Sequence, residues 1–127
     1  MELKPERNVL VSTLDFLGGC DETPVGLQQR SKIQDRRLSS STQFDSNTPP
    51  YNGRLGYTAG SSWCALSHDS TPYLQIDLGS VFIICGVATQ GNSKEDHWVK
   101  TYQVQYSMDD INRKEYRENG LVKVTCF

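Results

Sequence analysis

The sequence lacks the motifs that mark most enzymes, zinc proteins and membrane spans. None of its four cysteines stands in a C-x-x-C pair, which excludes the usual zinc and dithiol redox motifs. It has no phosphate-binding glycine loop, no H-E-x-x-H and no G-x-S-x-G sequence, so no enzyme class has positive support. No apolar stretch is long enough to cross a bilayer. The sequence therefore predicts a protein without catalysis.

The sequence also has no large excess of positive or negative charge. Thirteen basic residues nearly balance fifteen acidic ones, for a net charge of −2, so nothing draws the chain toward nucleic acid. A length of 127 residues suits one domain, and a mean hydropathy of −0.54 predicts a modest core. Residues 1–19 make a poor signal peptide, because Glu2, Glu6 and Asp15 interrupt them. We expect this segment to be a leader or linker and residues 20–127 to be the domain.

Two polar triplets invite a catalytic or metal interpretation that their spacing does not support. Ser67, His68 and Asp69 are consecutive, whereas a catalytic triad needs groups that converge from separate positions. Residues 95–97 place two acids beside a histidine, but adjacent residues in one loop rarely converge on an ion. We interpret both triplets as surface turns and predict no catalytic residue and no metal ligand.

Short strand patterns dominate the second half of the chain. In residues 73–78 and 102–106 apolar and polar side chains alternate, which is typical of half-buried strands. Residues 81–87 form a continuous, β-branched apolar run, which predicts a central strand. Residues 109–119 are ambiguous between a helix capped by Gly120 and a hairpin. Repeated short strands with turns between them predict an all-β sandwich or barrel.

The four cysteines, Cys20, Cys64, Cys85 and Cys126, are widely spaced. An even, dispersed set favours structural disulfides in an oxidising compartment over four buried thiols in a cytosolic protein. Three pairings are open.

The order of residues from Cys20 onward resembles the discoidin family, also called the coagulation factor V/VIII C-type domain. The strongest parts of the resemblance are these stretches: Ser62-Trp63-Cys64-Ala65, Tyr73-Leu74-Gln75-Ile76-Asp77-Leu78-Gly79, Gly86-Val87-Ala88-Thr89-Gln90-Gly91 and Trp98-Val99-Lys100 with Tyr102. Each is weak alone, but their order and spacing over about 100 positions are specific. The resemblance implies a jelly-roll-like β-barrel and an extracellular recognition module for cell adhesion.

The resemblance also implies a binding end built from three loops, residues 42–52, 57–61 and 92–97. The implied ligand-binding residues are Phe44, Asp45, Asn47, Tyr51, Asn52, Tyr57, Lys94, Glu95 and His97. Exposed aromatic rings and amide or carboxylate groups suit a cell-surface glycan or an extracellular protein. Aromatic loop tips also suit a phospholipid surface, although the acids of these loops oppose an anionic one. Some relatives hold a structural calcium ion, but no acidic motif for it stands here.

The chain departs from the family pattern near its end. Asp109-Asp110 and Arg113 replace the usual Asp-Gly and tryptophan of a hairpin. The resemblance places the final strands, and the cysteine that pairs with the counterpart of Cys20, beyond Phe127. It leaves Cys64–Cys85 as an alternative bridge. A third interpretation, beside the glycan or protein module and the phospholipid module, is a non-functional fragment, because a barrel without its last strands exposes strand edges and part of its core.

Overall fold

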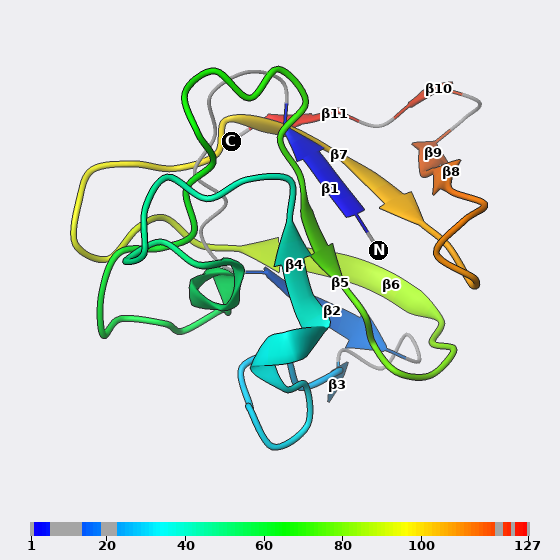
Figure 1. Cartoon of the computed structure of the whole chain (residues 1–127). Helices are drawn as coiled ribbons and strands as arrows, with labels where there is room; N and C mark the ends of the chain where they lie inside the picture. The colour runs from blue at the N-terminus through cyan, green and yellow to red at the C-terminus, as the bar shows by residue number, and fades with distance from the viewer. Residues whose placement is uncertain (1, 6–13, 19–22, 119–120, 123, 127) are drawn as a thin grey trace.

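The computed structural model is built almost entirely of short antiparallel strands (Figure 1). It describes residues 2–5, 14–18, 23–118, 121–122 and 124–126. The strands are β1 (Glu2–Pro5), β2 (Leu14–Gly18), β3 (Thr23–Pro24), β4 (Leu38–Ser40), β5 (Leu74–Ile76), β6 (Ile84–Thr89), β7 (Thr101–Tyr106), β8 (Lys114–Glu115), β9 (Arg117–Glu118), β10 (Leu121–Val122) and β11 (Val124–Cys126). Two 3₁₀ turns, η1 (Asp35–Arg37) and η2 (Pro50–Gly53), are the helical elements of the described residues. The all-β prediction is confirmed.

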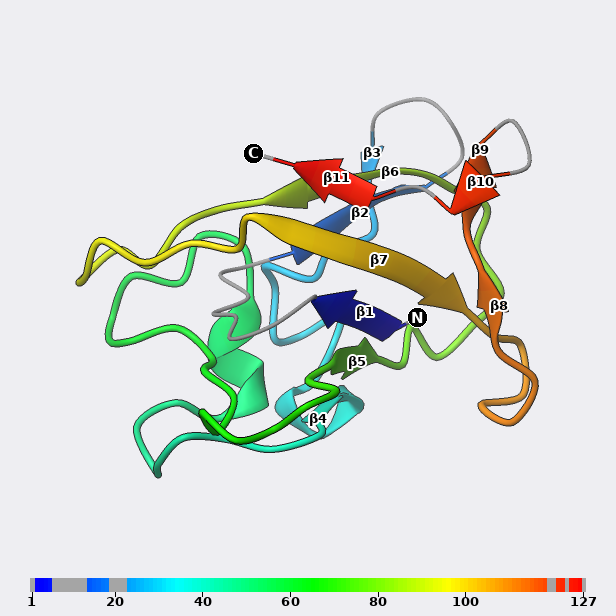
Figure 2. The same cartoon turned by 90° about the horizontal axis from the view of Figure 1, so that it is seen from above.

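The strands form two main sheets. The larger has the order β11-β7-β1-β5-β4, with β8 added to β7, and the smaller has the order β3-β2-β6. Figure 2 shows β11, β7, β1, β5 and β4 side by side in that order, and in Figure 1 the pair of β2 and β6 runs behind β4 and β5. Ile84 and Val87 of β6 pack on the core that the larger sheet covers. The two sheets therefore enclose one core, as in a sandwich.

The core follows the alternation of the central strands. Leu74 and Ile76 of β5 are buried while Gln75 between them is half-buried, as the period of two requires. Trp63 is the largest fully buried side chain, and Tyr102 of β7 lies with it in the same cluster. Alternation weakens along β7, because its last residue, Tyr106, is exposed while Gln105 is buried. The core therefore ends before β7 does.

The predicted strand over residues 81–87 is wrong at its start. Val81, Phe82 and Ile83 are exposed, and β6 begins only at Ile84. The partner strand explains the boundary, because β2 pairs with β6 from Ile84 to Thr89. An apolar run predicts a strand, but the strand forms only where a partner pairs with its backbone N–H and C=O groups.

Of residues 109–119 the structure describes 109–118, and these form a turn followed by two short strands, β8 and β9, instead of a helix. β8 pairs with the end of β7, and β9 pairs with β10. Asp110 at the preceding turn has a positive φ of 62°, a left-handed conformation that a helix cannot continue through. The hairpin alternative is therefore the correct one.

Two parts of the first 19 residues lie inside the sheets, where a leader or linker was expected. β1 pairs with both β5 and β7, and β2 pairs with both β3 and β6. The alternation in these two segments is too short to predict that they pair with distant strands, because such pairing is decided by tertiary context. The boundary of the domain at residue 20 stays a prediction.

Candidate functional site

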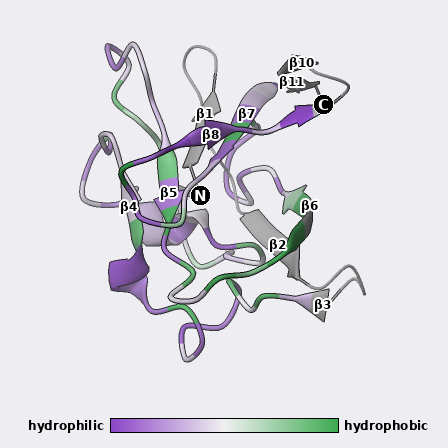
Figure 3. Cartoon of the chain, turned by 90° about the vertical axis from the view of Figure 1, so that its right-hand side faces the viewer, coloured by the Kyte–Doolittle hydropathy of each residue, from purple (hydrophilic) through white to green (hydrophobic). Residues whose placement is uncertain are grey.

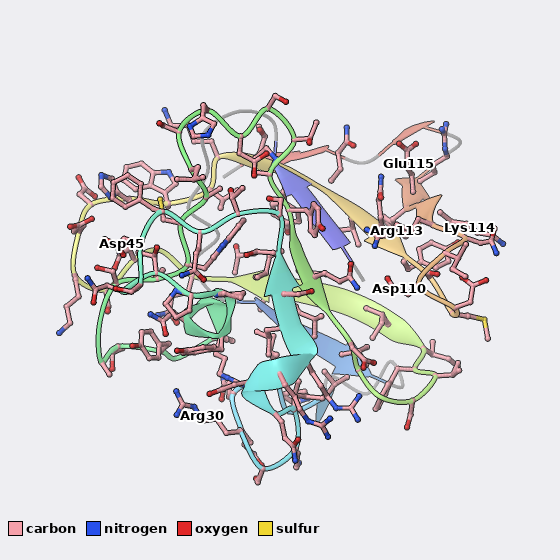
Figure 4. The ribbon with its side chains drawn as sticks, viewed as in Figure 1. Arg30, Asp45, Asp110, Arg113, Lys114 and Glu115 are labelled. Carbon is pink, nitrogen blue, oxygen red and sulfur yellow. The ribbon has the colours of Figure 1, made fainter. Side chains whose placement is uncertain are left out.

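The three predicted loops lie at one end of the sandwich, on the left of Figure 1. The first follows β4, the second follows η2, and the third follows β6. Figure 4 labels Asp45 at this end. We call this region, residues 42–52, 57–61 and 92–97, the three-loop end.

Hydrogen bonds from the core shape the first loop. The indole Nε1 of Trp63 donates to the backbone oxygen of Thr42 at 2.9 Å, and the backbone N–H of Phe44 donates to the oxygen of Cys64 at 2.7 Å. Asp45 then closes the loop, because its Oδ1 accepts the backbone N–H of Asn47 at 2.8 Å, an Asx turn. The loop tip is thus positioned by a fully buried side chain.

Asp69 anchors the base of the first loop. Its Oδ2 accepts hydrogen bonds from Ser41 Oγ and Thr42 Oγ1, both at 2.6 Å. Burial alone would raise the pKa of Asp69, but the hydrogen bonds from Ser41, Thr42 and the backbone of Thr71 lower it on balance. Asp69 therefore stays ionised and holds two distant segments together.

Asn52 holds the first two loops against each other. It is 4% exposed, and its Nδ2 donates to the oxygens of Asn47 at 3.0 Å and Ser61 at 2.8 Å. An amide engaged in this way positions the loops instead of offering its N–H groups to a ligand. We therefore reassign Asn52 from ligand contact to positioning within the proposed site.

The two predicted tyrosines fold back toward the protein. Tyr51 is half-buried against the core, with the guanidinium of Arg30 6.0 Å from its ring centroid. Tyr57 is also half-buried, and its hydroxyl approaches Gly60 so closely that a Cβ there would lie 3.1 Å away. Both rings are partly exposed and could contact a ligand from the side, but neither protrudes from the three-loop end.

Six predicted residues do reach solvent. Phe44 is 57% exposed, and the others are exposed too: Asp45, Asn47, Lys94, Glu95 and His97. His97 Nδ1 lies 3.0 Å from Glu95 Oε2, so a protonated His97 would neutralise that acid. The third loop is closed by the backbone N–H of Asn92, which donates to the oxygen of His97 at 2.9 Å.

Trp98 is an aromatic side chain that the sequence analysis did not assign to the site. It directly follows the third loop and is 49% exposed, whereas the next residue, Val99, is 5% exposed. The sequence did carry a signal for it. A polar loop is followed by alternating residues, in which the ring of Trp98 faces outward and Val99 faces inward.

Cys64 carries a free thiol, half-buried at the three-loop end. The alternative bridge Cys64–Cys85 is therefore wrong. Burial raises the pKa of Cys64, and the charges of Asp45 and Glu95 raise it further. Cys20 lies outside the described residues, and the structure does not describe the side chains of Cys85 and Cys126, so their pairing stays a prediction.

Within the described residues, no group of three or more histidine, cysteine, aspartate or glutamate side chains gathers as a metal site would. The described part of the chain likewise contains no helix with the length and apolar character of a membrane span.

Comparison with known proteins connects the chain to one domain family. The F5/8 type C domain family matches residues 37–125. Lactadherin of Sus scrofa is 32% identical over 120 residues, which cover 87% of this chain and 29% of lactadherin. Retinoschisin of Takifugu rubripes is 30% identical over 107 residues, which cover 80% of this chain and 38% of retinoschisin. The chain thus spans less than two fifths of either relative. No solved structure matches it.

Proposed function

The chain belongs to the F5/8 type C, or discoidin, domain family, whose general role is binding, and we propose that it is a non-catalytic extracellular adhesion module that grips a carbohydrate or protein ligand at the three-loop end. The single observation that carries the proposal is Phe44. Its ring is 57% exposed at the tip of a loop that backbone hydrogen bonds hold in place. A rigid, exposed ring among polar groups is a typical anchor for recognition.

The polar groups around Phe44 favour a sugar or a protein over an anionic lipid. The acids Asp45, Glu95 and Asp96 outnumber the single lysine, Lys94, in the three loops, so this end carries a net negative charge. Acids near a membrane surface oppose its negative potential. The same carboxylates, together with the amide of Asn47, can accept hydroxyl or N–H donors from a glycan or peptide.

The proposal is tested by binding to a glycan array and to collagen-coated surfaces. We expect Phe44→Ala to weaken saturable binding by about tenfold or more, because truncating an aromatic anchor costs about 2 kcal/mol or more at a hot spot. Phe82→Ala is the matched control, since Phe82 is 41% exposed but lies in the β5–β6 connection. An amide NMR spectrum of each variant checks that the fold is intact. Equal binding by the Phe44→Ala variant and the unsubstituted chain would remove Phe44 from the site.

A further inference from the structure

One sheet edge of the molecule is much longer than the others. In the smaller sheet, β6 stands at the end of the order β3-β2-β6, and among the described strands it pairs with β2 alone. β6 has six residues. The other described edge strands are short: β4 and β11 have three residues each, and β3, β8, β9 and β10 have two each. A long edge strand presents a row of backbone N–H and C=O groups with which another strand can pair.

The sequence around β6 carries no residue that would block such pairing. No charged residue, histidine or proline stands between Asp77 and Lys94. Proteins usually protect a sheet edge with lysine, proline or charge, and two of the short edges here carry them, since β8 is Lys114-Glu115 and β3 ends in Pro24. Figure 3 shows the contrast, with the segment that enters β6 in the green of hydrophobic residues and β8 in purple. The edge of β6 is therefore open to a partner strand.

The residues before β6 extend this edge into solvent. Val81 is 74%, Phe82 41% and Ile83 72% exposed, although branched and aromatic side chains are the ones that favour strands. They lie outside β6 because the pairing with β2 reaches only to Ile84. A new strand that pairs with β6 can continue along 81–83 and bring these side chains into cross-strand contact. The whole edge then spans residues 81–89.

The strand that fits this edge is β6 of a second copy of the chain. In a two-fold symmetric antiparallel pair, every charge in the stretch is repeated on the facing strand, where like charges repel. Residues 81–89 contain no charge, and their branched and aromatic side chains make favourable cross-strand pairs. The pairing also ends at two copies. β2 covers the inner edge of β6, and the far edge of the sheet is the two-residue β3, whose Pro24 has no N–H to donate.

We propose that two copies of the chain form a symmetric dimer in which their β6 edges pair antiparallel over residues 81–89. The three strands β3, β2 and β6 of each copy then make one continuous sheet. A single strand pair buries less than the roughly 1,600 Å² of a standard interface, so the dimer is weak, with a Kd on the order of 10 µM. The dimer does not rest on the ligand proposed for the three-loop end, because residues 81–83 lie at the opposite end of the molecule, on the right of Figure 1.

Sedimentation equilibrium over a concentration series tests the proposal. We expect the unsubstituted chain to show a monomer–dimer equilibrium. The double variant Val81→Lys with Ile83→Lys should raise the dimer Kd by about tenfold or more, because it places lysines of both copies along the paired edge. Met108→Lys with Ile111→Lys is the matched control. Met108 is 82% and Ile111 is 83% exposed, so this variant adds the same charge at equally exposed positions on the β7–β8 connection and should dimerise as the unsubstituted chain does. An amide NMR spectrum of each variant checks the fold.

Amide hydrogen exchange of the unsubstituted chain locates the contact without any substitution. About half of the β6 amides point away from β2, and these should exchange more slowly at high protein concentration than at low, while the amides of the β4 edge exchange alike at both. Three results would overturn the proposal: a monomer at every concentration up to the millimolar range, a dimer that Met108→Lys with Ile111→Lys abolishes but Val81→Lys with Ile83→Lys does not, or exchange of the β6 amides that is independent of concentration.

Discussion

Arg54 offers the sharpest test of what holds this fold together. It is 3% exposed, and its guanidinium donates through NH1 to the backbone oxygen of Leu27 at 2.7 Å and through NH2 to Asp35 Oδ1 at 2.8 Å. It thereby ties the end of η2 to two segments at least 19 residues away in the chain. Arg54→Met keeps a long apolar stem of similar reach and removes both bonds.

The expected loss of stability in Arg54→Met follows from the burial of the Arg54 side chain. Breaking a buried ion pair typically costs 3–5 kcal/mol, but two features reduce that figure here. The side chain of Asp35 is 36% exposed, so water can solvate it when Arg54 is gone. The Nε of Arg54 is buried without a partner, so its removal relieves an existing penalty. The oxygen of Leu27 is left unsatisfied, and we expect a net loss of about 3 kcal/mol in the free energy of unfolding.

Urea unfolding followed by circular dichroism measures this loss. With a slope of about 2 kcal/mol per M, the midpoint should fall by about 1.5 M. Arg37→Met is the matched control, because Arg37 lies at a similar 2.9 Å from Asp77 but both side chains are far more exposed. An exposed pair is worth about 1 kcal/mol or less. If the two variants lose the same stability, burial of the Arg54 pair does not govern its contribution and the reasoning is refuted.

Three further predictions follow from the core, from one turn and from the free thiol. Trp63→Phe should destabilise the chain by about 2 kcal/mol in urea unfolding, because it leaves a void in the core and frees the Thr42 oxygen; a smaller loss than that of an exposed Tyr106→Ala control would contradict it. Hydrogen bonds from the backbone and side chain of Asn112, then from Ile111 and Ser107, hold the pKa of Asp109 well below its usual range. Because the folded pKa is the lower one, this contribution to stability is present above the unfolded value of about 4 and is lost as pH falls toward the folded pKa. A carboxyl NMR titration of Asp109 with a midpoint near 4 would refute this. Burial raises the pKa of Cys64, so its alkylation at pH 7 should be about tenfold or more slower than that of an exposed thiol, measured as the peptide mass shift that Cys64→Ser removes; rapid labelling in the folded state would contradict it.

The elements that could be predicted from the sequence are those whose signal is local. β7 spans Thr101–Tyr106 and contains the predicted strand 102–106 whole, while β5 is a three-residue part of the predicted 73–78. Both carry their own alternation and flanking turns, so tertiary context did not have to override them. The family resemblance rested on ordered residues along the chain, and the match over residues 37–125 confirms it.

The candidate site was predictable in its position and less so in its parts. Phe44 is an exposed loop tip as expected, since polar neighbours and turn residues predict a surface loop. Asn52 and Tyr51 have the same local signature, yet the first is buried in hydrogen bonds and the second packs on the core. What separates them from Phe44 is contact with distant residues, which no local pattern records.

The sequence by itself determined the all-β class, the family and the place of the three loops, because period-two alternation, turn residues and motif order are local or linear properties of the chain. Only the tertiary structure decided which residues of those segments are covered. The exposure of Val81 and Ile83 depends on where β2 stops pairing with β6. The burial of Arg54 depends on Leu27 and Asp35, and the free state of Cys64 on the folding of the loops around it. Burial and pairing are set by segments far apart in sequence that meet only on folding.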